Sequence, residues 1–379
     1  MRISSVSWLL LAILISPVIG FGQQNFPQSP VQGDHLFSEK GCSKCHSILG
    51  QGGRIGHDLG KINLKGSRLD VASAMLNNAQ TMGGKMREMK IIRPHLTGAE
   101  IENLIAFLYY VNYFDEPGNS TRGKGLFKER QCIRCHTDPS SFPRGMTPIY
   151  LAKTLWNHGP RMSAQMSRLG IPWPRFEGVE MMDLVAYLRE TARSESATTY
   201  GVPGNPNEGR KVYRSKGCPQ CHGGSNDSTQ PNLANPALGL QVSLTQTVSR
   251  LWNHAPQMFS RLSEQGLEAP HFSEREIADL VAYIYFLNYF DSSPDLTAGR
   301  KLFADKQCNT CHSLGGGIQG AGPDLSASPK ASSSIDMVAA MWNHTPFMHS
   351  VMQEKEIPWP RFEKGELNDL LGYIQSLKK

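Results

Sequence analysis

The clearest pattern of apolar positions lies at the C-terminal end of the chain. Five apolar residues recur there at positions i, i+3, i+4, i+7 and i+10, namely Leu367, Leu370, Leu371, Ile374 and Leu377. They lie on one face of a helix with 3.6 residues per turn, so the pattern predicts an amphipathic helix. Similar segments occur at three earlier places. Two of these begin with a capping box, Thr97 with Glu100 and Ser273 with Glu276.

One stretch of the chain is continuously apolar, residues 8–15 near the N-terminus. Arg2 precedes this stretch, and Pro17 and small residues follow it. The run is too short for a membrane span and matches a secretory signal peptide over residues 1–22, cleaved after Gly22 or two residues earlier. An uncleaved anchor is the alternative, although Pro17 would interrupt its helix. We therefore expect a periplasmic or otherwise exported protein that is soluble after cleavage.

The eight cysteines form four copies of the motif Cys-x-x-Cys-His, with none left over. Disulfides are the usual use of cysteine in exported proteins, and zinc or a redox dithiol would explain a single copy. Four complete copies instead predict four covalently attached haem c groups, each with two thioether bonds and one histidine on its iron. The sites are Cys42, Cys45 and His46; Cys132, Cys135 and His136; Cys218, Cys221 and His222; and Cys308, Cys311 and His312.

The motifs belong to an internal repeat. Their first cysteines are 90, 86 and 90 residues apart, and a helical lead-in precedes each motif, so the repeat predicts four small domains. After the signal peptide of residues 1–22, we expect domains at residues 32–116, 119–194, 204–292 and 295–379.

The four copies are of two types. Copies one and three end in Asn112–Asp115 and Asn288–Asp291, both Asn-Tyr-Phe-Asp, whereas copies two and four share Ile-Pro-Trp-Pro-Arg-Phe-Glu at 171–177 and 357–363. The chain therefore reads as a two-domain half that has been duplicated, with a linker at Thr191–Asn207. We call the segments Asn112–Asp115 and Asn288–Asp291 the exit strings. Because they are short and aromatic, they predict fixed docking of the two domains within each half.

The second axial ligand is predicted from the alignment of the four closing helices. One methionine keeps the same distance from that helix in every copy: Met82, Met162, Met258 and Met348. A second methionine four residues later is replaced by Leu262 in copy three. A histidine four residues earlier, at His158, His254 and His344, is replaced by Asn78 in copy one. Core packing is the alternative role for the first methionines, and iron ligation is the alternative for the three histidines.

Each copy resembles a class I c-type cytochrome domain, with an N-terminal helix, the haem motif, a loop, a distal methionine and a closing helix that carries an aromatic residue. The resemblance covers about residues 34–379 and implies an all-α fold of four tandem helical domains, each around one covalent haem. In that family a proline carbonyl after the motif orients the haem histidine. Pro231 and Pro323 match this proline, copy one has His57 there, and copy two is ten residues shorter in this loop.

Composition and ligand chemistry indicate electron transfer. The chain has 39 Lys and Arg against 33 Asp and Glu, a formal charge of +6 without a dense basic run, so nucleic acid is not an expected partner. Iron with His and Met on opposite faces has no open site for a small-molecule substrate. We therefore expect a carrier, not an enzyme, whose partners are a donor and an acceptor redox protein, with a membrane complex among the candidates. The alternatives are a dedicated haem subunit of a larger respiratory oxidoreductase and, with an open iron site in domain two, a haem enzyme.

Overall fold

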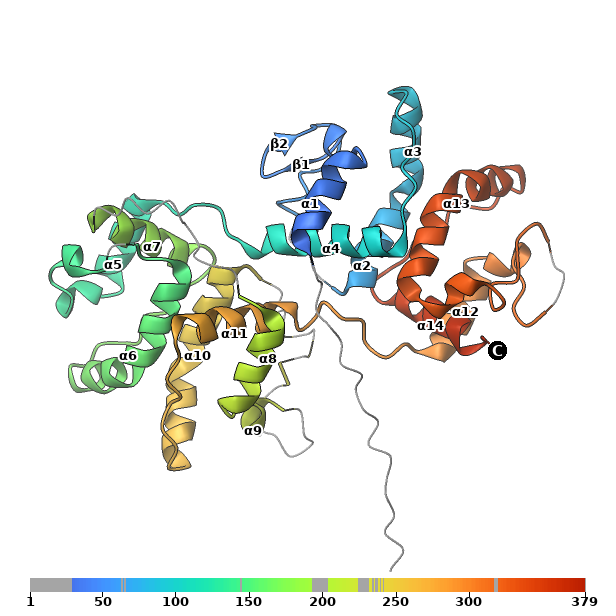
Figure 1. Ribbon diagram of the computed structural model, residues 1–379. Helices are drawn as coiled ribbons and strands as arrows, with labels where there is room; N and C mark the ends of the chain where they lie inside the picture. The colour runs from blue at the N-terminus through green and yellow to red at the C-terminus, as the bar shows by residue number, and fades with distance from the viewer. Residues whose placement is uncertain are drawn as a thin grey trace, which may run out of the picture.

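The chain is a set of helices joined by loops (Figure 1). The computed structural model describes residues 29–378, apart from residues 63, 65, 144, 193–203, 224–231, 234, 236, 237, 239, 241 and 317–319. Within these residues, strands are limited to the antiparallel pair β1 (Ser47–Ile48) and β2 (Gln51–Gly52). The predicted all-α fold is confirmed, and the predicted signal peptide lies outside the described residues.

The described helices form four units, which we number in chain order. Unit 1 contains α1 (Pro30–Glu39), α2 (Arg68–Asn77), α3 (Ala79–Glu88) and α4 (Gly98–Tyr113); unit 2 contains α5 (Ser120–Glu129), α6 (Pro148–Arg168) and α7 (Glu180–Thr191). Unit 3 contains α8 (Pro206–Ser215), α9 (Pro219–His222), α10 (Leu244–Glu264) and α11 (Glu274–Phe286); unit 4 contains α12 (Leu296–Asp305), α13 (Ser334–Glu354) and α14 (Glu366–Ser376). Across the described part of the chain, every helix is too short or too polar to cross a membrane.

Each unit is built on the crossing of its lead-in helix and its closing helix: α1 with α4, α5 with α7, α8 with α11, and α12 with α14. A glycine of the lead-in helix lies at every crossing, where any Cβ would overlap a backbone carbonyl of the closing helix. Glycine is therefore required there by close approach, since it alone lacks a Cβ. The four glycines are Gly33, Gly123, Gly209 and Gly299.

A repeated ion pair joins the haem motif to the closing helix. The basic residue two positions before the first cysteine binds a glutamate in the first turn of that helix in all four units. The pairs are Lys40–Glu100 (2.7 Å), Arg130–Glu180 (3.0 Å), Lys216–Glu276 (2.8 Å) and Lys306–Glu366 (2.8 Å). In units 1 and 3 the same glutamates complete the predicted capping boxes, which are confirmed.

The units pair in an order that the sequence did not predict. Helices α6 and α10 pack together and join unit 2 to unit 3, whereas α13 packs on α2, α3 and α4 and joins unit 4 to unit 1. Figure 1 shows the red unit 4 beside the blue and cyan unit 1, and the green unit 2 beside unit 3. The expected docking of the two units within each half is therefore wrong, because each half packs its second unit on the first unit of the other half.

An asparagine makes the same two hydrogen bonds in every one of these interfaces. Its side-chain amide donates to the carbonyl, and accepts from the peptide N–H, of one residue in the partner unit. The four reciprocal contacts are Asn157 with Phe272, Asn253 with Phe176, Asn343 with Leu96, and Asn77 with Phe362, all at 2.7–3.0 Å. We call these four contacts the amide clamps.

Units 1 and 3 dock through the exit strings. Asp115 of the first string accepts hydrogen bonds at the start of α10, from Ser243 and from the N–H of Thr245 (3.0 Å). Asp291 of the second string does the same at the start of α2, from the N–H of Leu69 (3.1 Å) and from the Arg68 side chain (2.8 Å). A carboxylate is favoured at a helix N-terminus by the free N–H groups and the helix dipole. The exit strings therefore fix unit 1 to unit 3.

The amide clamps should contribute strongly to stability. Asn157→Ala removes both bonds to the peptide group of Phe272, whose side chain is 2% exposed. We expect the free energy of unfolding, measured by denaturant titration, to fall by about 1–3 kcal/mol, because buried backbone groups lose their partners. Asn103→Ala is the control, since its side chain bonds only to Gln32 at the surface and should change this free energy by less than about 0.5 kcal/mol. Equal losses in the two variants would contradict the role of the clamp.

Candidate functional site

The four Cys-x-x-Cys-His motifs adopt one turn. In each, the backbone N–H of the histidine donates to the backbone carbonyl of the first cysteine at 2.9 Å. In units 1, 2 and 4 the motif begins a short 3-10 helix, at Cys42–Lys44, Cys132–Arg134 and Cys308–Thr310, and in unit 3 it forms α9. In units 3 and 4 both cysteines and the histidine of the motif line the same cavity.

The first cysteine of each motif is partly buried against the core. Burial raises the pKa of Cys42, Cys132, Cys218 and Cys308 to about 11, so these thiols stay protonated at neutral pH. All eight cysteines are free of disulfides in the structure. Partly buried, protonated thiols are compatible with thioether attachment of an apolar prosthetic group.

The haem histidine is oriented through its Nδ1 atom. In unit 4, Nδ1 of His312 lies 3.1 Å from the carbonyl oxygen of Pro323, as the resemblance implied. In unit 1, Nδ1 of His46 lies 3.0 Å from the carbonyl oxygen of His57, so the same bond forms without a proline. Both contacts leave Nε2 as the nitrogen that can bind iron. In unit 3 the predicted Pro231 lies outside the described residues.

In unit 2 the haem histidine has a different neighbour. The shorter loop places the ring of Phe142 at 5.3 Å from the ring of His136, measured between centroids. The pKa of His136 is lowered by burial and by the nearby His158. The loop carbonyl that units 1 and 4 use is thus replaced, in unit 2, by aromatic packing.

A glycine precedes the residue whose carbonyl accepts from the haem histidine, and it allows the loop to approach the histidine ring. A Cβ on Gly322 would lie 2.6 Å from Cε1 and Nδ1 of His312, and Gly56 has the same relation to His46. We expect Gly322→Ala to displace His312 and to change the absorption and spin state of the unit 4 haem. The change should be confined to the haem of unit 4, read by visible and EPR spectroscopy.

Gly84→Ala is the matched control for this substitution. Gly84 lies inside α3, and a Cβ there would meet no atom within 4 Å. Alanine should therefore leave the haem spectrum unchanged and stabilise the helix by about 0.5–1 kcal/mol. An unchanged spectrum in Gly322→Ala would show that the loop does not position the histidine.

Apolar cavities adjoin the motifs in units 3 and 4. The cavity of unit 3 has a volume of about 570 Å³ and that of unit 4 about 200 Å³. Both thiols and the haem histidine line one wall in each, and leucine and isoleucine side chains line much of the remainder. Covalent haem fits this set of residues, because the wall combines two thiols, an iron ligand and an apolar surface for the porphyrin.

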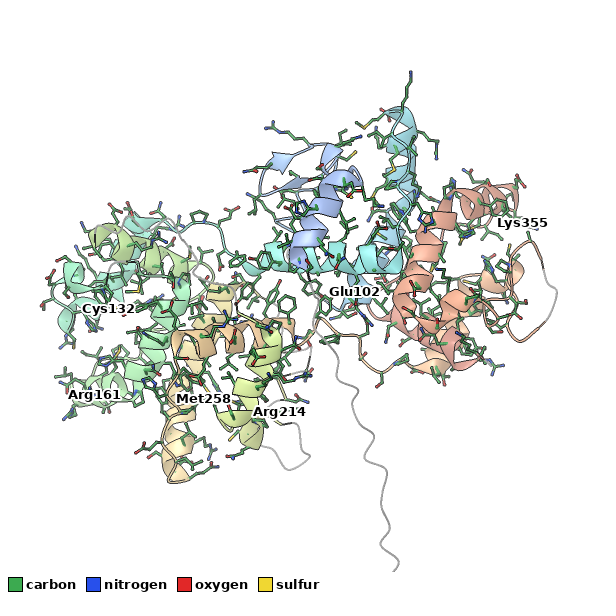
Figure 2. The ribbon with its side chains drawn as sticks, in the orientation of Figure 1. Glu102, Cys132, Arg161, Arg214, Met258 and Lys355 are labelled. Carbon is green, nitrogen blue, oxygen red and sulfur yellow. The ribbon has the colours of Figure 1, made fainter. Side chains whose placement is uncertain are left out.

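Two kinds of candidate second ligand also line these cavities. In unit 3, Met258 and His254 lie one turn apart on α10 and both line the cavity; Figure 2 labels Met258 on this helix. The rings of His222 and His254 are 6.4 Å apart between centroids, so this histidine faces the haem histidine across the cavity. Burial and the neighbouring His222 lower the pKa of His254.

The other units have some of the same candidates for the second iron ligand. In unit 4, Met348, His344 and the second methionine Met352 all line the cavity. In units 1 and 2, Met82 and Met162 are partly buried against the core. Asn78, which replaces the histidine in unit 1, donates to the carbonyl of Ala74 instead. Met82, Met162, Met258 and Met348 therefore stay the predicted ligands.

Two features of the sites were missed by the reasoning from sequence. The clamp asparagines are present in all four copies, one position before the histidine set that was compared, so their constancy was a signal. Trp156 of unit 2 lines the cavity of unit 3, and no pattern within one copy could reveal a contact between two copies.

Comparison with known proteins identifies three of the four units. The model of the family described as Cytochrome c matches residues 30–112, 206–287 and 296–378. No curated protein and no solved structure matches the chain.

Proposed function

Because the chain belongs to the cytochrome c family, and is thereby a haem-binding electron-transfer protein, we propose that it is an exported carrier with four haem c groups. The main observation in support of four haems is that the same local architecture recurs around the motif in all four units. The motif turn, the ion pair to the closing helix and the glycine at the helix crossing are the same in each.

Unit 2 decides whether the number of haems is three or four, because the family match omits it. Three observations support a fourth haem. The N–H of His136 donates to the carbonyl of Cys132 at 2.9 Å, Arg130 binds Glu180, and Gly123 lies at the crossing of α5 and α7. These are the features that units 1, 3 and 4 have in common.

The proposed ligand set favours electron transfer over catalysis. With histidine on one face and Met82, Met162, Met258 or Met348 on the other, iron has no open position for a substrate. A thioether ligand also raises the reduction potential. We propose that the electrons come from one exported redox protein and pass to another, with a membrane complex as one candidate partner.

Haem counting tests this proposal. The mature protein, purified from the exported fraction, should have an N-terminus at residue 23 and carry four covalent haems by intact mass and haem absorption. The double variant Cys132→Ala and Cys135→Ala should lose one haem and keep three. Three haems in the unaltered protein, with no further loss in the double variant, would contradict the fourth site. Co-purification of a stoichiometric partner would instead identify the chain as a subunit of a larger complex.

A further inference from the structure

A tryptophan of unit 2 forms part of the haem cavity of unit 3. Trp156 lies on α6 and is 6% exposed. It lines that cavity together with Cys218, Pro270 and Phe272, all of unit 3. Its indole N–H donates to the carbonyl of Pro270 at 2.8 Å. The side chain is thus held in the wall of a site that belongs to another unit.

Helix α6 carries residues that serve two units. Trp156 lines the cavity of unit 3, and Asn157 forms an amide clamp with Phe272 of unit 3. The same helix carries Met162, the predicted iron ligand of unit 2.

Helix α10 of unit 3 repeats this arrangement in the opposite direction. Its Trp252 donates to the carbonyl of Pro174 in unit 2 at 2.7 Å and stacks on Trp173, with 4.0 Å between ring centroids. Its His254 faces the haem histidine of unit 3. Units 2 and 3 thus exchange tryptophans across one interface.

Tryptophans also line the interface between units 1 and 4. Trp342 of unit 4 donates to the carbonyl of Pro94 in unit 1 (3.0 Å), and Trp359 donates to that of Leu76 (3.1 Å). All five tryptophans in the described part of the chain therefore bond a carbonyl of the partner unit; they are Trp156, Trp173, Trp252, Trp342 and Trp359.

We propose that the haem sites work as two redox-coupled pairs, units 2 with 3 and units 1 with 4, and that Trp156 belongs to the haem site of unit 3. Within a pair, one electron leaves the reduced iron and arrives at the oxidised iron, and no proton or group is transferred. This inference rests on the proposed function, since it requires haem in all four units. The proposed pairs differ from the pairs of neighbouring units in the sequence, which are units 1 and 2 and units 3 and 4.

Paramagnetic NMR of the full-length loaded protein tests the pairing. Each ferric haem should give its own set of shifted methyl signals. The double variants Cys132→Ala with Cys135→Ala and Cys218→Ala with Cys221→Ala should each delete one set and so assign units 2 and 3; the same change at the other two motifs assigns units 1 and 4. During stepwise reduction, the signals of a site should shift most when its pair partner is reduced.

The outcomes separate this inference from the proposed function. Four sets of signals, with coupling between 2 and 3 and between 1 and 4, support the pairs. Four sets with the strongest coupling between 1 and 2 and between 3 and 4 overturn the pairs and leave the carrier intact. Fewer than four sets contradict the proposed function itself.

Substitution of Trp156 tests its assignment to unit 3. Trp156→Leu introduces the residue that unit 1 has at the equivalent position, Leu76, so we expect the fold to persist. The methyl signals of unit 3 should shift. Trp359→Leu is the matched control, because it removes an interface tryptophan and one hydrogen bond from the other pair and should leave the unit 3 signals in place. A shift confined to the signals of unit 2, or no shift, overturns the assignment.

Discussion

Cutting the chain between units 2 and 3 should leave its two halves bound to each other. The N-terminal half holds units 1 and 2, and the C-terminal half holds units 3 and 4. Because unit 2 packs on unit 3 and unit 4 packs on unit 1, two interfaces bridge the cut. The contact between units 1 and 3, through Asp115 and Asp291, bridges it as well. Separation requires the loss of all three contacts at once.

A protease recognition sequence placed within residues 193–203 allows the measurement. After cleavage, verified on a denaturing gel, the two fragments should elute together in size-exclusion chromatography at the volume of the uncut protein. Elution as two separate species would contradict the exchanged pairing, because halves with only internal contacts would diffuse apart.

Graded loss of the amide clamps is the control for the cut protein. Changing Asn157 and Asn253 to alanine weakens only the interface between units 2 and 3, so the fragments should still elute together. Further replacement of Asn77 and Asn343 removes the clamps between units 1 and 4. Loss of a clamp leaves one backbone N–H and one carbonyl unsatisfied, and each group that stays buried lowers the free energy of unfolding by about 1–3 kcal/mol. The fourfold variant should therefore separate at a lower denaturant concentration.

The sequence predicted the elements because the information for them is local. The closing helix of unit 4 follows from its apolar periodicity, and the start of α4 follows from the capping box of Thr97 and Glu100. The orientation of the haem histidine was only partly predicted. The bond to His46 comes from a backbone carbonyl, which any residue supplies, so the absence of a proline at His57 carried little information.

The pairing of the units could not be predicted because both orders use the same contacts. Any clamp asparagine can bond the peptide group of any partner loop, whether that loop carries Phe272, Phe176, Phe362 or Leu96. Repeated units are therefore equivalent partners in sequence. In the structure the exit string of unit 1 leads to unit 3, where its Asp115 accepts from the N–H of Thr245. That direction is a property of the packed chain, not of a motif.

Met258→Ala should remove methionine ligation from one haem and leave the other three unchanged. Met258 lines the cavity of unit 3, and the residue one turn later is Leu262, so no second thioether stands nearby. The methionine–iron charge-transfer absorption of the oxidised protein should fall by about a quarter. The potential of that haem should also fall, because the thioether no longer stabilises the reduced iron.

The structure suggests what replaces the thioether and provides a control. His254 lies on the same wall of the cavity and faces His222, so the altered haem should become low-spin with two histidines, visible in its EPR spectrum. Met352→Ala changes the second methionine of unit 4, which lines the cavity beside Met348, and should keep the full charge-transfer absorption. If Met258→Ala also keeps it, and the unaltered protein already has a two-histidine EPR signal, His254 is the ligand and Met258 is a packing residue. His254→Ala alone then separates the two roles, because it should change the iron's ligation if His254 is the ligand and should leave the charge-transfer absorption intact if Met258 is the ligand.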